Sequence, residues 1–297
     1  MGIVLQSIIF KKPNRDLQKT IFSLLEKGKY IRPADLAGSV ISLLKLEPTL
    51  QKHLQRVDSH LIQSPLDVVS DLNELPLLLK LMSVCPLPDL ELEKLFKNLR
   101  SAILSNISSL KEASPVTLNV QSAIALQCFT NEYIYNTTEA EEELLRPLEA
   151  SVKKTLENHD QPSAQVLLVL ASYKALNEYD WHNFLVCKDE FLEVFTRQVE
   201  EPNQEKKLKT NLPILHEINN DISSEVRAQY EESPYPRWVN LGLSVKPMSI
   251  SKVVDKVKLE LHNHKIIEIE RPDILIAGCG TGQHPIGTAT RFKSQKS

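Results

Sequence analysis

The feature that most constrains the fold is a short apolar run followed by three closely spaced glycines. Residues 274–276 are branched apolar side chains, and Gly278, Gly280 and Gly282 follow them. An unbroken run of this kind is typical of a central parallel strand that is covered on both faces. Glycines directly after such a strand let the backbone turn sharply and approach a ligand with no Cβ in the way. Because Pro285 suits the first turn of a helix, the run predicts a strand, a glycine loop and a helix whose first amides can hold an anionic group.

The spacing of these glycines narrows the class of ligand. The dinucleotide fingerprint has its third glycine one position later, where this chain has Gln283, and a phosphate-binding loop needs Gly-Lys-Ser or Gly-Lys-Thr. The remaining match is Gly-Cys-Gly-Thr-Gly at residues 278–282, which resembles motif I of the class I S-adenosylmethionine-dependent methyltransferases. A glycine turn that joins a strand to a helix and binds no ligand is the alternative.

A second unusual segment, residues 226–238, gathers two tyrosines, a tryptophan and two prolines in a chain with only 6% aromatic residues. Proline fixes φ and disfavours helix in the preceding residue, so we expect a helix that ends near Glu232 to continue as a stiff, extended strap. The strap is either a lid over a ligand or an interdomain packing segment, since buried aromatic residues usually belong to a core. As a lid or substrate strap, it would use Tyr230, Tyr235, Arg237 and Trp238.

Together the two segments resemble a group of bacterial class I S-adenosylmethionine-dependent methyltransferases that are often fused to tetratricopeptide repeats. In that group a Tyr-Glu-Glu-x-Pro-Tyr-Pro-Arg-Trp segment, here residues 230–238, precedes an Ile-Ala-Gly-Cys-Gly-Thr-Gly-Gln-His run, here residues 276–284. Similarity at residues 32–35 and 127–133 extends the resemblance from about residue 21 to residue 292. One departure is Ile276, which stands where many members have an acidic residue. The resemblance implies that S-adenosylmethionine binds to Gly278, Cys279, Gly280, Thr281, Gly282, Gln283 and His284.

The resemblance therefore implies a methyltransferase, with its methyl acceptor and catalytic residues unassigned. The tetratricopeptide relatives point to a protein or peptide as the acceptor. From Asp273 to Ser297 the chain has about 25 residues, fewer than the roughly 30 of one βαβ unit. We therefore expect the chain to be truncated just after motif I and to be inactive on its own. The alternative function is a non-catalytic helical protein-interaction module with a remnant methyltransferase core.

From about residue 16 to residue 195, apolar side chains recur at helical spacing between short polar breaks. The predicted fold class is mainly α: a helical domain at residues 1–210, then the first strand, glycine loop and helix of an α/β, Rossmann-like methyltransferase domain at residues 211–297. Local signals predict where individual helices begin or end. These signals are Gly28 after a first helix, Pro33 and Pro115 at helix starts, Asp89 as a cap, and the capping-box pair Thr138 and Glu141.

The end of the helical domain is predicted in less detail. We expect helices at residues 163–177 and 190–200, and then a linker at residues 202–207. Ser223 or Ser224 would cap the helix that carries Tyr230.

Charge, hydropathy and cysteine spacing argue against several classes of function. The net charge of −3 does not suit a nucleic-acid surface, which is usually strongly basic. The densest apolar run, residues 75–82, is too short to cross a bilayer, and the N-terminus does not read as a signal peptide. We therefore expect a cytoplasmic protein with no membrane partner. The four cysteines lie far apart without zinc spacing, so we expect no metal, and three of the four as buried thiols.

Overall fold

We describe the protein from a computed structural model, which describes residues 5, 8–29, 31–59, 64–107, 114–211, 221–232, 237–243, 246–269 and 273–292. The chain divides into two compact units, one of Met1–Phe22 with Ala34–Glu217 and one of Ser23–Pro33 with Ile218–Ser297. The domain boundary that we predict after residue 210 stays a prediction, because residues 212–220 lie outside the described ranges.

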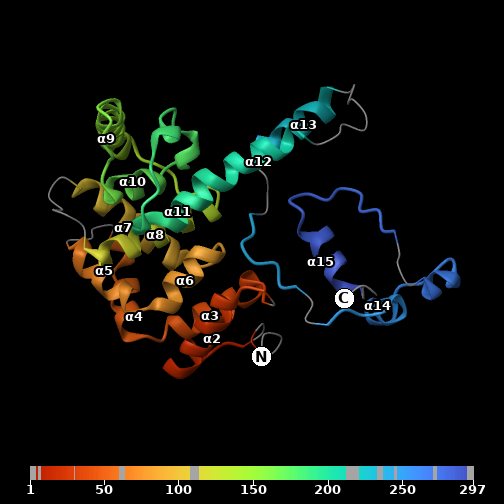
Figure 1. Ribbon diagram of the computed structural model, residues 1–297. Coiled ribbons are helices and arrows are strands. Elements are labelled where there is room, and N and C mark those ends of the chain that lie inside the picture. Colours follow the sequence, from red (N-terminus) through yellow and green to blue (C-terminus); the bar gives the residue numbers. More distant parts are fainter. Residues whose placement is uncertain are drawn as a thin grey trace. The chain divides into compact units, whose positions relative to one another are not determined.

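The described part of the first unit consists of α-helices joined by turns and short 3-10 segments (Figure 1). None of the described helices is long and apolar enough to span a membrane. The α-helices, including α2 at the division between the units, are α2 (Arg15–Lys27), α3 (Pro33–Leu44), α4 (Pro48–Leu54), α5 (Pro65–Asn73), α6 (Pro76–Val84), α7 (Leu90–Ser105), α8 (Pro115–Thr130), α9 (Glu139–Glu157), α10 (Ala164–Ala171), α11 (Leu192–Phe195) and α12 (Glu201–Lys209).

Prolines and side-chain caps start most of these helices. Helices α3, α4, α5, α6 and α8 each begin with a proline, whose missing N–H removes no hydrogen bond in the first turn. The Asp89 carboxylate caps α7 by accepting from the Leu92 amide at 3.1 Å. Gly28 follows α2 with a φ of +62°, a left-handed value that glycine adopts without strain. The predictions at Pro33, Pro115, Asp89 and Gly28 are confirmed.

Helix α9 begins with the capping box that the sequence predicts. The Glu141 carboxylate accepts from the Thr138 backbone N–H at 2.8 Å, and the Thr138 hydroxyl accepts from the Glu141 N–H at 3.3 Å. The Tyr173 hydroxyl donates to the other carboxylate oxygen of Glu141 at 2.7 Å. Burial acts to raise the pKa of Glu141, but these hydrogen bonds and the charge of Arg100 outweigh it, so the pKa lies below its usual value.

We expect Glu141→Gln to lower the free energy of unfolding by about 1 kcal/mol at neutral pH, because the charged acceptor of the cap is lost. A carboxylate with a lowered folded pKa stabilises above its unfolded pKa, and this contribution is lost as the pH falls through the folded pKa. The difference between variant and wild type should therefore shrink below a pH of about 4.5. Urea unfolding followed by circular dichroism measures it, with Glu143→Gln at an exposed position of α9 as the control. An equal loss in the control would contradict this prediction.

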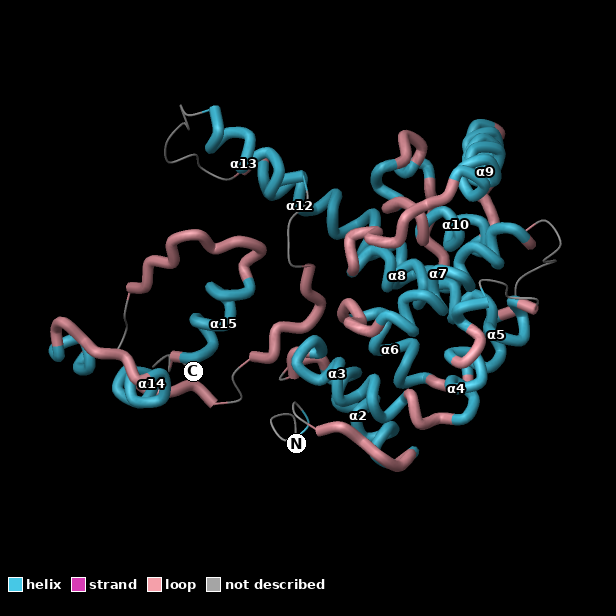
Figure 2. Tube along the Cα trace, turned by 180° about the vertical axis from the view of Figure 1, so that it is seen from behind, coloured by secondary structure: helices cyan, strands magenta, loops and turns pink. Residues whose placement is uncertain are grey.

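Helix α8 is the central helix of the first unit. Helices α5, α6 and α10 pack against it, and views from opposite sides both show it among them (Figure 2). The sequence predicts an apolar stripe along α8, but its buried residues also include the polar Gln121, Gln127 and Thr130. Burial on several sides requires internal partners for such groups, and the Thr130 hydroxyl donates to the Leu126 carbonyl at 2.6 Å. The stripe is therefore only part of the buried surface of this helix.

Three sequence predictions are wrong at the end of the first unit, two about helices and one about a linker. The helix expected at residues 163–177 ends at Ala171, and a 3-10 segment at Leu176–Glu178 follows. There the Leu176 amide donates to the Gln198 side chain at 3.1 Å, a partner far along the chain that local spacing does not reveal. The helix expected at residues 190–200 is a 3-10 turn followed by α11 and a π-helical segment, Thr196–Glu200.

The linker expected at residues 202–207 is wrong, because these residues are helical. They belong to α12, which follows the π-helical segment without a break. Pro202 lies in the first turn of α12, where a missing N–H is tolerated, and the Glu201 N–H reaches back five residues to the Thr196 carbonyl. Proline therefore marks a change of helix type here and not a break in the helix.

The described part of the second unit contains α13 (Asp221–Glu232), α14 (Ile250–Val257), a 3-10 segment at His264–Glu268 and α15 (Gln283–Arg291). Ser223 and Ser224 do not cap the helix that carries Tyr230, because α13 begins two residues before the first of them. The next helix, α14, does have a serine cap: the Ser249 hydroxyl accepts from the Lys252 amide at 3.4 Å.

The strand predicted at residues 274–276 is wrong for the described part of the chain. The segment is irregular there, and the side chains of Leu275 and Ile274 are 94% and 46% exposed. A strand satisfies its backbone groups only by pairing with a neighbour, and the one β-type pairing among the described residues is an isolated bridge between Met248 and Phe292. The mainly α class is confirmed, whereas the described residues show no Rossmann-like strand.

Candidate functional site

The glycine loop of the second unit has the backbone geometry that its composition predicts. Gly278, Gly280 and Gly282 have φ values of +72°, +52° and +85°, all in the left-handed region that favours glycine. The Gly282 amide donates to the Cys279 carbonyl at 3.1 Å, which closes the turn directly before α15. The three glycines therefore serve a tight turn that other residues would adopt only with strain.

Helix α15 starts from this turn, with its N-terminal amides next to the loop. Gly282 is the cap residue and provides no side-chain acceptor for the first amides of the helix. Pro285 lies in the first turn, as the sequence predicts, and the Ile286 amide donates to the Gly282 carbonyl at 3.2 Å. Free amides and the positive end of the helix dipole together favour an anionic group, such as the carboxylate of an amino acid.

The loop is open on its glycine side. A Cβ built on Gly278 or Gly280 would meet no atom within 4 Å, and Cys279 and His284 are exposed. A ligand could therefore contact the loop backbone closely. Thr281, Gly282 and Gln283 are half-buried.

One residue of the aromatic strap contacts the glycine loop directly. The indole Nε1–H of Trp238 donates to the Thr281 carbonyl at 3.0 Å, and Trp238 is half-buried. The two sequence segments that carry the resemblance are therefore in contact within the second unit. Of the other strap residues, Arg237 is half-buried, Tyr230 lies on α13, and Tyr235 is outside the described residues.

A further contact in the second unit was not predicted from the sequence. The Met248 amide donates to the Arg291 carbonyl at 2.7 Å, and this forms part of the parallel bridge between Met248 and Phe292. The contact fixes the end of α15, the helix that begins at the glycine loop. A buried indole N–H usually finds a hydrogen-bond partner, so the sequence gives a reason to expect a contact at Trp238 but none at Met248.

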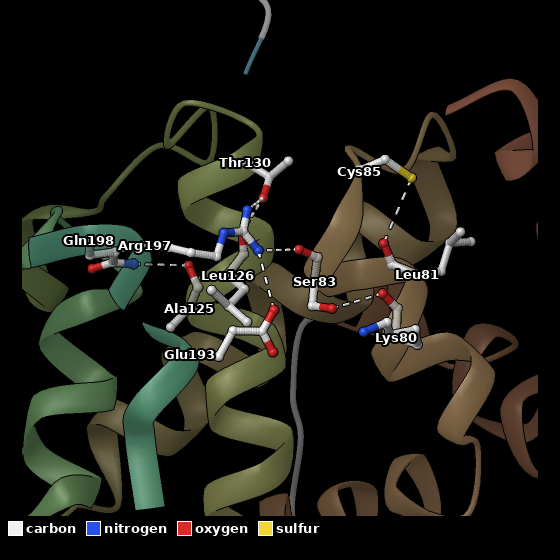
Figure 3. Close-up of polar contacts among 10 residues, drawn as sticks. All are labelled: Lys80, Leu81, Ser83, Cys85, Ala125, Leu126, Thr130, Glu193, Arg197 and Gln198. Atoms are coloured by element: carbon white, nitrogen blue, oxygen red, sulfur yellow. Dashed lines mark hydrogen bonds and ion pairs between the residues drawn. The ribbon is translucent and has the colours of Figure 1, made fainter. Parts of the chain in front are cut away.

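A group of buried polar contacts around Arg197 and Gln198 lies in the first unit, and it was not predicted from the sequence. The Arg197 side chain is buried, with 7% of its surface exposed. Its guanidinium donates to the Ser83 carbonyl and, at 3.1 Å, to the Thr130 hydroxyl (Figure 3). It also lies 3.7 Å from the Glu193 carboxylate. The side-chain amide of the next residue, Gln198, donates to the Ala125 carbonyl of α8 at 3.3 Å and to the Ala171 carbonyl of α10 at 3.1 Å.

These contacts hold the π-helical segment against α6, α8 and α10. The guanidinium hydrogen bonds are directed at protein oxygens of α6 and α8, which the π-helical segment brings within reach. We therefore assign Arg197 and Gln198 a structural role. Among the described residues, no group of three His, Cys, Asp or Glu side chains is arranged to hold a metal ion.

The cysteines partly match the prediction of three buried thiols. Cys85 and Cys128 are buried, and burial raises their pKa values to about 12 and about 11, so both remain protonated at neutral pH. Cys187 is only half-buried, and the prediction is wrong for it. Cys279 is exposed in the glycine loop.

No protein-family model, curated protein or solved structure matches this chain. The candidate site is therefore defined by its residues and by the geometry of the glycine loop.

Proposed function

We propose that the second unit carries the cofactor-binding start of an S-adenosylmethionine-dependent methyltransferase. The observation that carries the proposal is the turn of three left-handed glycines before α15, held by Trp238 through the Thr281 carbonyl. The amides at the start of α15 would bind the carboxylate of the cofactor's methionyl portion, and the exposed loop backbone would lie against the ribose. The proposed binding residues are Gly278, Cys279, Gly280, Thr281, Gly282, Gln283 and His284.

Methyl transfer needs the cofactor's sulfonium methyl group in line with a nucleophile, so the proposed role of this loop is to position the cofactor. We propose a protein or peptide as the methyl acceptor and the cytoplasm as the location. Because the described residues show no paired strand beside the loop, we expect cofactor binding by this chain without methyl transfer.

Nuclear magnetic resonance of the full, nitrogen-15-labelled chain tests the proposal. Titration with S-adenosylmethionine should shift the amide signals of residues 278–284 and the indole N–H signal of Trp238, which bonds to the loop. The indole signal of Trp181, in the first unit, is an internal control and should stay in place. Loop signals that stay unchanged at millimolar cofactor would contradict the proposal.

The alternative is a non-catalytic helical interaction module with a remnant methyltransferase core. The irregular, exposed segment around Leu275 favours it, because a working fold of this class would bury that residue in a sheet. The same titration separates the two functions, since the remnant core should leave the loop signals unchanged.

We expect Trp238→Phe to weaken cofactor binding by about 2- to 10-fold, because phenylalanine keeps an aromatic ring but cannot donate to the Thr281 carbonyl. Without this hydrogen bond the cofactor would have to order the loop as it binds, and this ordering costs binding free energy. The nitrogen-15 titration measures the change, with Trp181→Phe as the matched control. Unchanged affinity in Trp238→Phe would show that this contact is packing alone.

A further inference from the structure

A hydrogen bond between distant parts of the chain joins the turn after α2 to the residues that follow the aromatic strap. Ser23–Pro33 and Ile218–Ser297 together form the second unit. Within it the Leu243 amide donates to the Lys29 carbonyl at 2.8 Å. Leu243 comes five residues after Trp238, the strap residue that donates to the Thr281 carbonyl of the glycine loop. The turn after α2 therefore contacts the segment that leads to this tryptophan.

Two glycines, one in each segment, allow this close approach. Gly28 and Gly242 have φ values of +62° and +64°, both in the left-handed region that favours glycine. A Cβ on Gly242 would lie 2.9 Å from the backbone nitrogen of Arg32, and a Cβ on Gly28 would lie 2.9 Å from the side-chain oxygen of Asn240. Each glycine thus faces the other segment, and a side chain fits at either position only if its neighbour moves.

We propose that the turn after α2 clamps the segment behind Trp238 and so positions the indole for the glycine loop. Asn240 is two residues from Trp238, and two residues of chain span at most about 7 Å. Fixing Asn240 therefore limits where the indole can lie and keeps its N–H on the Thr281 carbonyl. The two glycines are positioning residues that act through this path. The clamp consists of Gly28, Lys29 and Arg32 on one side and Asn240, Gly242 and Leu243 on the other.

The clamp has a consequence for the proposed cofactor site. A loop that is already held costs less free energy to order when its ligand binds, so an intact clamp favours cofactor binding. This consequence rests on the proposed function. The clamp itself acts on Trp238 with or without a ligand, and the two can therefore be tested apart.

The first test uses the full, nitrogen-15-labelled chain without any ligand. In Gly242→Ala the new Cβ meets the backbone of Arg32, so we expect the indole N–H signal of Trp238 to move. The indole signal of Trp181, in the first unit, should stay in place and shows that this unit is folded. Gly38→Ala is the control, because a Cβ on this α3 glycine meets no atom beyond its own helix within 4 Å. An unmoved Trp238 signal in Gly242→Ala, or equal movement in Gly38→Ala, would overturn the proposal.

A double-mutant cycle tests the clamp from its other side, and it decides the question even if Gly242→Ala does not fold. Gly28→Ala should move the Trp238 signal less than Gly242→Ala does, because the Asn240 side chain can turn away whereas the Arg32 backbone cannot. Asn240→Ala removes the atoms that the new Cβ would meet, so Gly28→Ala should have a smaller effect in that background. Equal movement in both backgrounds would overturn the proposal, since the effect would then come from the strained backbone of residue 28 alone.

Titration with S-adenosylmethionine separates the clamp from the proposed function. If the wild type binds the cofactor, we expect Gly242→Ala to weaken binding by about 2- to 10-fold, as for Trp238→Phe, because both changes disturb the same hydrogen bond. Unchanged affinity in Gly242→Ala would overturn the positioning role. If the wild type does not bind the cofactor, the proposed function fails, and the indole signals of the ligand-free chain still decide whether the clamp exists.

Discussion

Replacing Gly280 with valine is expected to abolish the effect of S-adenosylmethionine on the loop signals while the first unit stays folded. Gly280 has a φ of +52°, and a β-branched residue adopts that value only with strain. The space beside the glycine is open, so the variant would fail through its backbone and not through a clash within the protein. Circular dichroism checks the folding of the helices, and the nitrogen-15 titration checks cofactor binding.

Gly287→Val is the matched control for this variant. Gly287 lies within α15, a Cβ there also meets no atom within 4 Å, and its φ is not in the left-handed region. The control should keep most of the cofactor binding. Equal loss in the two variants would show that valine disturbs the segment in general, and retained binding in Gly280→Val would contradict the proposed site.

The substitution Arg197→Met is expected to lower the free energy of unfolding by about 3 kcal/mol, which corresponds to roughly 6–12 °C in melting temperature. Methionine fills a similar length but donates no hydrogen bond, so the Ser83 carbonyl and the Thr130 hydroxyl both lose their contact with Arg197. Thermal and urea unfolding followed by circular dichroism measure the loss.

Arg146→Met, at an exposed position of α9, is the control and should change the stability by less than about 0.5 kcal/mol. Arg197→Lys should recover part of the loss, because lysine keeps the charge but not the planar fork that reaches two oxygens. A loss below about 1 kcal/mol in Arg197→Met would contradict the structural role assigned to this residue.

The helix starts could be predicted from the sequence because their causes are local. The start of a helix depends on atoms within about four residues. In the structure Pro33 begins α3, Asp89 caps α7, and Thr138 and Glu141 form the capping box of α9. The positive φ values of the glycine loop were predictable for the same reason.

Most of the errors concern features that depend on distant partners. A strand at residues 274–276 would need a neighbouring strand, and its apolar composition alone does not supply one. The helix that ends at Ala171 is followed by a turn whose Leu176 amide donates to Gln198, a residue far along the chain. The continuous helix through Pro202 has a local cause, the π-helical turn before it, which the apolar pattern does not reveal. The contact between Trp238 and Thr281 joins two segments that lie far apart in the sequence, so neither segment alone predicts it.

The π-helical segment before α12 has a consequence for how this helix tolerates insertions and deletions. Arg197, Gln198 and Val199 lie in this segment and are buried, and the first two donate to oxygens of other helices. Deletion of one residue from Thr196–Glu200 would restore regular winding and rotate everything beyond it by about 100° around the axis. The two buried polar side chains could then no longer both reach their partners, so the length of this segment is fixed to the residue.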